Sequence, residues 1–164
     1  MDFKSIYQSK LTTPADAVAR IGSGSNISMG MAMTEPPALL KALADRASAR
    51  NVDDLKVYYF ESTPIAGETI LRYELGDRIH PYCMFISPVE RALIKKGEQN
   101  GGRKVLTYVP SNFSQSPRIL TEHIGNSAPT VIARHQGCTT KTSKLATYSS
   151  TGQVERLPTW TTFG

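Results

Sequence analysis

With 164 residues, 40% of them hydrophobic, the chain has enough apolar material for one domain with a sizeable core. No run approaches the roughly 18 consecutive apolar residues of a membrane-spanning helix, and the N-terminus lacks the apolar stretch of a secretory signal, so we expect a soluble cytoplasmic protein. The formal net charge of +5 comes from scattered basic residues. Because no basic stripe is interleaved with aromatic residues, a nucleic-acid partner is not expected.

Strand-like and helix-like segments alternate along the first four fifths of the chain. Several helices are predicted to begin at a proline, where the missing N–H costs nothing: Thr13-Pro14, Glu35-Pro36-Pro37, Ser87-Pro88 and Ser116-Pro117. The periodicity predicts helices over 3–11, 14–21, 37–49, 65–73, 88–96 (ended by Gly97) and 117–124, and strands over 26–29, 55–60, 79–86, 104–109 and 130–133.

This alternation predicts an α/β fold for residues 1–133, an open, doubly wound, mostly parallel sheet with helices on both faces. The pattern stops after Ala133. Residues 135–164 hold eight threonines and three serines with almost no apolar periodicity. Such a composition buries too little apolar surface to offset its ordering entropy, so residues 134–164 are predicted to be a disordered tail.

Ligands of open α/β sheets bind at the carboxyl ends of the strands, where loops lead into helices. The loop from Gly30 to Pro36 fits such a site best, because glycine permits close backbone approach and the following helix start offers free N–H groups to an anionic oxygen. The alternative is that Gly30 only turns the chain and that Met31 and Met33 fill the core.

No catalytic machinery is recognisable from spacing alone. Glu35, Glu61 and Glu68 lie near predicted strand ends, but none forms a pair with a base or a nucleophile. The three histidines are far apart. Cys83 falls in an apolar run, where a buried free thiol is expected, and Cys138 falls in the tail. Neither cysteine has metal-ligand spacing, so we expect no disulfide and no metal.

Three long segments resemble a known enzyme family. They are residues 24–43 (Gly-Ser-Asn-Ile-Ser-Met-Gly-Met-Ala-Met-Thr-Glu-Pro-Pro-Ala-Leu-Leu-Lys-Ala-Leu), residues 54–60 (Asp-Leu-Lys-Val-Tyr-Tyr-Phe) and residues 105–114 (Val-Leu-Thr-Tyr-Val-Pro-Ser-Asn-Phe-Ser). Residues 3–125 resemble the N-terminal domain of the acetyl-CoA hydrolase / 4-hydroxybutyrate CoA-transferase family. In detail they are most similar to 4-hydroxybutyrate or itaconate CoA-transferases.

The resemblance implies acyl-CoA:carboxylate CoA transfer between two similar α/β domains. A glutamate of the second domain attacks the acyl-CoA and forms a glutamyl anhydride and then a glutamyl-CoA thioester, which is covalent catalysis. Coenzyme A is then a substrate rather than a bound cofactor, and the partners are a small acyl-CoA and a carboxylate. The first domain supplies acyl-pocket loops, one with Gly30, Met31, Glu35 and Pro36 and another with Asn112 and Ser114.

The family's continuation after the fifth strand is not found in this sequence. Residues after Ala133 read Arg-His-Gln-Gly-Cys-Thr-Thr, and no residue matches the catalytic glutamate, so no catalytic residue is assigned. We hypothesise that the tail follows a frameshift and that the chain is a truncated form. The alternatives are a non-catalytic fragment or binding module, and an isomerase, which would need an acid/base pair near Gly30. Exposed interdomain surface would favour self-association, which leaves a homo-oligomer open.

Overall fold

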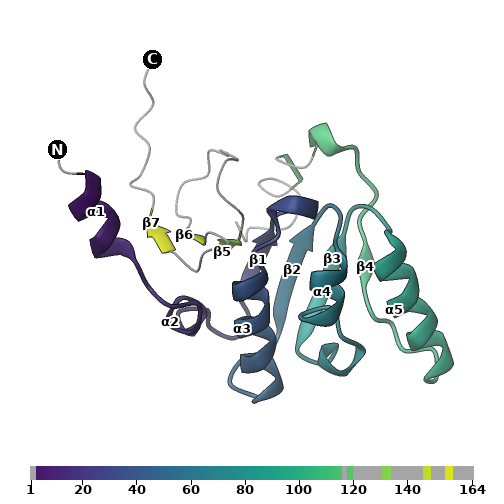
Figure 1. The fold of residues 1–164 in the computed structure, drawn as a ribbon. Helices are drawn as coiled ribbons and strands as arrows, with labels where there is room; N and C mark the ends of the chain where they lie inside the picture. Colours follow the sequence, from purple (N-terminus) through teal and green to yellow (C-terminus); the bar gives the residue numbers. More distant parts are fainter. Residues whose placement is uncertain (1–2, 116–117, 120–130, 134–145, 149–153, 157–164) are drawn as a thin grey trace.

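The computed structural model describes residues 3–115, 118–119, 131–133, 146–148 and 154–156 (Figure 1). The elements are the helices α1 (Phe3–Lys10), α2 (Pro14–Ala19), α3 (Pro37–Ser48), α4 (Pro64–Glu68) and α5 (Pro88–Gln99), the short 3-10 helices η1 (Ala32–Thr34), η2 (Tyr73–Leu75) and η3 (Phe113–Gln115), and the strands β1 (Asn26–Met29), β2 (Leu55–Tyr59), β3 (Ile79–Cys83), β4 (Thr107–Tyr108), β5 (Val131–Ala133), β6 (Ala146–Tyr148) and β7 (Val154–Arg156).

The strands form one sheet in the order β4-β3-β2-β1-β5-β6-β7. Every neighbouring pair is parallel except β6 with β7, which is antiparallel. From β1 to β4 each new strand is added on the same side, and β5 then returns to the other side of β1. This order confirms the predicted α/β fold with an open, mostly parallel sheet.

Three connecting helices, α3, α4 and α5, lie side by side in front of the sheet in Figure 1. They follow β1, β2 and β3, which are added in one direction, so they cover one and the same face. The connection from β4 to β5 was predicted to contain a helix over 117–124. Apart from residues 118 and 119, that helix lies outside the described residues.

The sheet extends into the segment predicted to be a disordered tail. β6 pairs with β5 through Ala146, Thr147 and Tyr148, and β7 pairs with β6. The other residues after Ala133 lie outside the described part of the chain, as do Cys138 and His135.

The core lies between the sheet and the helices. Leu39, Leu40 and Leu43 of α3 are each at most 3% exposed, as the helical spacing predicts. Leu55 and Val57 of β2 are fully buried, which is typical of a central parallel strand. Within the described residues, no helix has both the length and the apolar character needed to cross a membrane.

Two predicted helix ends differ from the observed ends by three residues or more, and the helix predicted over 14–21 ends two residues early, at Ala19. The helix after β2 ends at Glu68, not at residue 73, because the Thr69 hydroxyl donates to the Ile65 carbonyl at 2.7 Å and the chain turns to bury Ile70 and Leu71. The following helix continues through Gly97 to Gln99.

Gly97 is buried in α5 because the helix packs closely on the loop that follows it. A Cβ at this position would stand 2.7 Å from the Arg103 carbonyl oxygen and 2.8 Å from Val105 Cγ1. The chain turns only at Gly101 and Gly102, whose φ angles of 84° and 73° suit glycine.

Of the described helices, α2, α3, α4 and α5 begin at a proline. Thr13 accepts a hydrogen bond from the Asp16 N–H, and Ser87 with Glu90 forms the predicted capping box. A further start, Thr63-Pro64, was not among the predicted proline starts. Its threonine makes no side-chain cap, because its hydroxyl is used in the contact described below.

Candidate functional site

The carboxyl ends of β1, β2, β3 and β4 meet at one edge of the sheet, the upper edge in Figure 1. The loops that leave this edge are residues 30–36, 60–63, 84–87 and 109–115. Open α/β sheets bind ligands at such an edge, so the contacts among these four loops define the candidate site.

The loop after β1 is closed tightly on itself. The Thr34 N–H donates to the Met31 carbonyl at 2.9 Å, and the Thr34 hydroxyl donates to the same oxygen at 2.7 Å. A Cβ on Gly30 would stand 2.5 Å from the Thr34 carbonyl oxygen. Ala32 has a φ of 47°, which is rare for a residue with a side chain. The close approach that Gly30 permits is therefore made by the loop's own backbone.

Glu35 is buried and binds the start of α4. It is 3% exposed, and its two carboxylate oxygens accept from the Thr63 N–H at 2.7 Å and from the Thr63 hydroxyl at 2.5 Å. Burial raises the pKa of Glu35, and the hydrogen bonds from Thr63 oppose this rise. Glu35 therefore joins the β1 loop to the β2 loop. Pro36, beside it, is also fully buried.

A second buried carboxylate, Glu90, lies on the other side of the β2 loop. It is 0% exposed, accepts from the Ser62 hydroxyl at 2.5 Å and accepts from the Ser87 N–H at 2.9 Å. Tyr59 is buried nearby. Burial above all, and then the negative charge of Glu90, raise the pKa of the Tyr59 hydroxyl well above its usual value, so this hydroxyl stays protonated.

Aromatic rings from three loops gather at this edge. The Phe60 ring stacks with that of Phe85 at 6.3 Å between centroids and meets that of Phe113 edge-on at 5.1 Å. Phe85 is 47% exposed and Phe113 is 61% exposed, while Met33 on the β1 loop is 89% exposed. Exposed apolar side chains grouped in this way are typical of a surface that binds an apolar ligand or another protein surface.

The predicted site residues differ in how deeply they are buried at this edge. Gly30 and Met31 are half-buried in the β1 loop, whereas Glu35 and Pro36 lie beneath it. Asn112 and Ser114 are exposed and flank Phe113. The Phe113 contact with Phe60 brings the second predicted loop to the end of β2.

The remaining candidate residues form no second site. Burial raises the pKa of the Cys83 thiol to about 12, and Cys83 is a buried free cysteine as predicted. His80 lies 3.4 Å from Asp54 at the surface. Glu68 is exposed on α4. Within the described ranges, no group of three or more His, Cys, Asp or Glu side chains could hold a metal ion.

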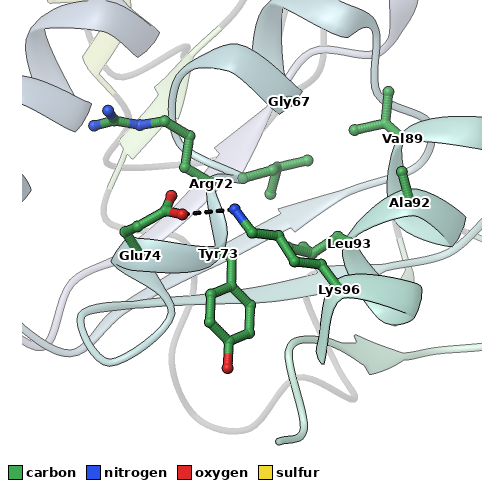
Figure 2. Close-up of a pocket in the computed structure, with 9 residues that line it drawn as sticks. Gly67, Arg72, Tyr73, Glu74, Val89, Ala92, Leu93 and Lys96 are labelled. Atoms are coloured by element: carbon green, nitrogen blue, oxygen red, sulfur yellow. Dashed lines mark hydrogen bonds and ion pairs between the residues drawn. The ribbon is translucent and has the colours of Figure 1, made fainter. Parts of the chain in front are cut away.

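Figure 2 shows a surface groove of about 330 Å³ between the segment after α4 and helix α5. Val89 and Leu93 line its apolar wall. Across it, Lys96 Nζ pairs with Glu74 Oε1 at 2.6 Å and lies 5.4 Å from the centre of the Tyr73 ring. None of its lining residues comes from the four loops. Lys96 and Glu74 already pair with each other, so their charges are less available to a ligand than the groups at the carboxyl ends of the strands.

The fold and the site at the strand ends define a protein of the open α/β class, and comparisons show which known proteins it is similar to. No family model and no curated protein matches the chain. Among solved structures, it is similar to the crystal structure of RipA from Yersinia pestis, with 57% sequence identity and a TM-score of 0.77. The match covers 82% of this chain but only 31% of that chain, so the chain spans about a third of the length of RipA.

Solved variants of RipA carry substitutions at the RipA residues numbered 31, 60 and 61. The chain is 56% identical to RipA variants in which Met31 is replaced by Gly (TM-score 0.78), Phe60 by Met (0.77) and Glu61 by Val (0.77). This chain has the same residue types at the same three numbers. Other RipA variants replace a glutamate numbered 249 by Asp or Ala.

Sequence reasoning missed most of the contacts that build the site. The sequence pattern places Phe60 at the end of a strand and Phe113 in a loop, with no sign that the two rings meet. Their contact depends on β2 and β4 being separated by just one strand, β3. The sequence predicts the role of Glu90 in the capping box, but its complete burial and its hydrogen bond from Ser62 have no sequence signal.

Proposed function

We propose that this chain forms the N-terminal α/β part of an acyl-CoA:carboxylate CoA-transferase of the 4-hydroxybutyrate, acetate or itaconate type, and that the edge at the strand ends contributes the wall of the acyl pocket. The observation that carries the proposal is the meeting of three loops around Phe60. Phe113 contacts its ring, and the Ala32 N–H donates to the carbonyl of the next residue, Glu61, at 3.4 Å.

The chemistry of this edge suits a small acyl group. Met31, Phe60 and Phe113 supply apolar contact, while the exposed amide of Asn112 and the hydroxyl of Ser114 offer hydrogen bonds to a polar acyl substituent. We infer that the acyl chain lies along Met31 and Phe60, with Glu61 beside it.

Neither of the two buried carboxylates of this edge is suited to be the nucleophilic glutamate. Glu35 and Glu90 are buried, and each carboxylate oxygen already accepts a hydrogen bond. A carboxylate nucleophile must approach the thioester carbonyl carbon directly, so neither is suited to the attack. We assign this step to a glutamate outside these 164 residues, in keeping with the family resemblance and with the two-domain arrangement it implies.

Nuclear magnetic resonance on the ¹⁵N-labelled chain tests the proposal. Acetyl-CoA should shift the amide signals of Met31, Phe60 and Glu61, and free coenzyme A, which lacks the acyl group, should leave them in place. Equal shifts with both compounds, or none with either, would refute an acyl-pocket role for this edge.

A CoA-transfer assay with acetyl-CoA and several carboxylate acceptors completes the test. We expect no turnover by the chain alone. Turnover that Glu61→Gln abolishes would instead place the nucleophile in this chain. Acyl-dependent shifts without turnover would favour the alternative of a binding module for the isolated chain.

A further inference from the structure

The short segment after β2, residues 61–63, is held by one side chain from the β1 loop and by one from helix α5, which follows β3. On the β1 side, Glu35 accepts two hydrogen bonds from Thr63, at 2.7 and 2.5 Å. On the β3 side, Glu90 accepts from the Ser62 hydroxyl at 2.5 Å. Because β1 and β3 flank β2 in the sheet, the two carboxylates hold consecutive residues from opposite directions.

Both carboxylates are themselves fixed. Glu90 is 0% exposed and also accepts from the Ser87 N–H at 2.9 Å in the capping box. Glu35 is 3% exposed and is followed by the fully buried Pro36. Burying a carboxylate costs free energy unless its oxygens accept hydrogen bonds, and hydrogen bonds to charged groups are among the stronger ones in proteins. The arrangement therefore holds residues 61–63 more rigidly than apolar packing of a surface loop would.

The two residues assigned to the proposed pocket lie at the start of the held segment. Phe60 directly precedes it and contacts Phe113. Glu61 is its first residue, and the Glu61 carbonyl accepts from the Ala32 N–H. A shift of Ser62 or Thr63 would move all of these contacts, because the chain connects them without an intervening turn.

We propose that Glu35 and Glu90 are positioning residues that hold residues 61–63 from two sides and thereby set the placement of Phe60 and Glu61. The functional part rests on the proposed function, which puts Phe60 and Glu61 in the acyl pocket. Glu35, expected from the family resemblance to lie in the substrate loop, then acts through Thr63 rather than on the substrate.

Amide hydrogen exchange measures the placement without any substrate. The reporter is the Ala32 amide, which donates to the Glu61 carbonyl and takes no part in the hydrogen bond between Ser62 and Glu90. Ser62→Ala should raise its exchange rate roughly tenfold, as expected when a hydrogen bond to a charged group is lost. The Gly24 amide, which donates to Asp53 near the opposite ends of the strands, should not change.

A threonine pair gives the second arm and its control. Thr63→Val removes the hydroxyl that donates to Glu35 and should also raise the exchange rate of the Ala32 amide. Thr63→Ser keeps a hydroxyl and should restore the wild-type rate. Thr69→Val is the matched control, because the Thr69 hydroxyl donates only to carbonyls of its own helix. Should Ser62→Ala unfold the chain, the threonine comparison decides alone.

The outcomes separate the two proposals. Ala32 exchange that is the same in Thr63→Val and Thr69→Val would overturn the positioning role. If the role holds, Thr63→Val should weaken the acetyl-CoA-dependent shift at Phe60 at least several-fold, with rescue by Thr63→Ser. If wild-type chain shows no acetyl-CoA shift, the proposed function fails, and the exchange rates still decide whether residues 61–63 are held as proposed.

Discussion

Replacing Gly30 by alanine tests whether the tight turn after β1 is fixed by space rather than by backbone conformation. Gly30 is not among the glycines with positive φ, so alanine could adopt its backbone angles. Its Cβ, however, would stand 2.5 Å from the Thr34 carbonyl oxygen, 2.6 Å from the Thr34 hydroxyl and 3.0 Å from the Thr34 carbonyl carbon. Two of these three atoms belong to the backbone and cannot rotate away.

The size of the effect follows from two opposing contributions. Overpacking a tight site costs about 1–3 kcal/mol, whereas alanine lowers the entropy of the unfolded chain and returns about 0.4–1 kcal/mol. We therefore expect Gly30→Ala to lower the free energy of unfolding by about 1–2 kcal/mol. With a urea dependence of about 2 kcal/mol per molar, the middle of the usual range for small proteins, the unfolding midpoint should fall by roughly 0.5–1 M.

Urea unfolding followed by far-ultraviolet circular dichroism measures this shift, and Gly22→Ala is the matched control. Gly22 precedes the same strand, also has no positive φ, and a Cβ there would meet nothing within 4 Å. Gly22→Ala should leave stability unchanged or raise it slightly. Gly30→Ala should also abolish the acetyl-CoA shift at Met31. Equal stability of the two variants would refute the steric argument.

Further expectations concern α5, the buried thiol and the buried carboxylate. Gly97→Ala should destabilise the chain by about 1 kcal/mol despite the better helix propensity of alanine, because the new Cβ meets a backbone oxygen. Gly67→Ala should cost less, because its Cβ meets only a valine methyl group, at 2.9 Å. A lower urea midpoint for Gly67→Ala than for Gly97→Ala would contradict this. In a Cys138→Ser variant, Cys83 should stay unlabelled by iodoacetamide at mildly alkaline pH, because its thiol is buried and has a pKa of about 12. If the folded chain were labelled as fast as the urea-unfolded chain, the thiol would be accessible and this expectation would be wrong. Burial raises the pKa of Glu35 above 4.5, so the folded chain keeps this carboxyl proton to higher pH than the unfolded chain does. The contribution of Glu35 to the free energy of unfolding therefore falls as pH rises from 4.5 through the folded pKa. Glu35→Gln should remove that fall from the pH dependence of urea unfolding.

The amino-acid sequence by itself determined the local elements and the fold class. Proline after a hydroxyl residue marked the starts at Pro14 and Pro88, and the strand Asn26–Met29 was predicted with its observed bounds. These signals are readable because they depend on residues close together in the chain. The same locality misled at Gly97, where glycine predicted a helix end but serves close packing against Arg103 and Val105.

Only the tertiary structure decided which residues meet at the strand ends. Glu35 and Thr63 are 28 positions apart, as are Ser62 and Glu90, and their contacts arise because parallel strands bring successive loops to one edge. Burial of the two carboxylates depends on what covers them, and no spacing rule reveals it. The sequence therefore placed the candidate residues at the carboxyl ends of the strands, and the fold decided that Glu35 faces Thr63 there.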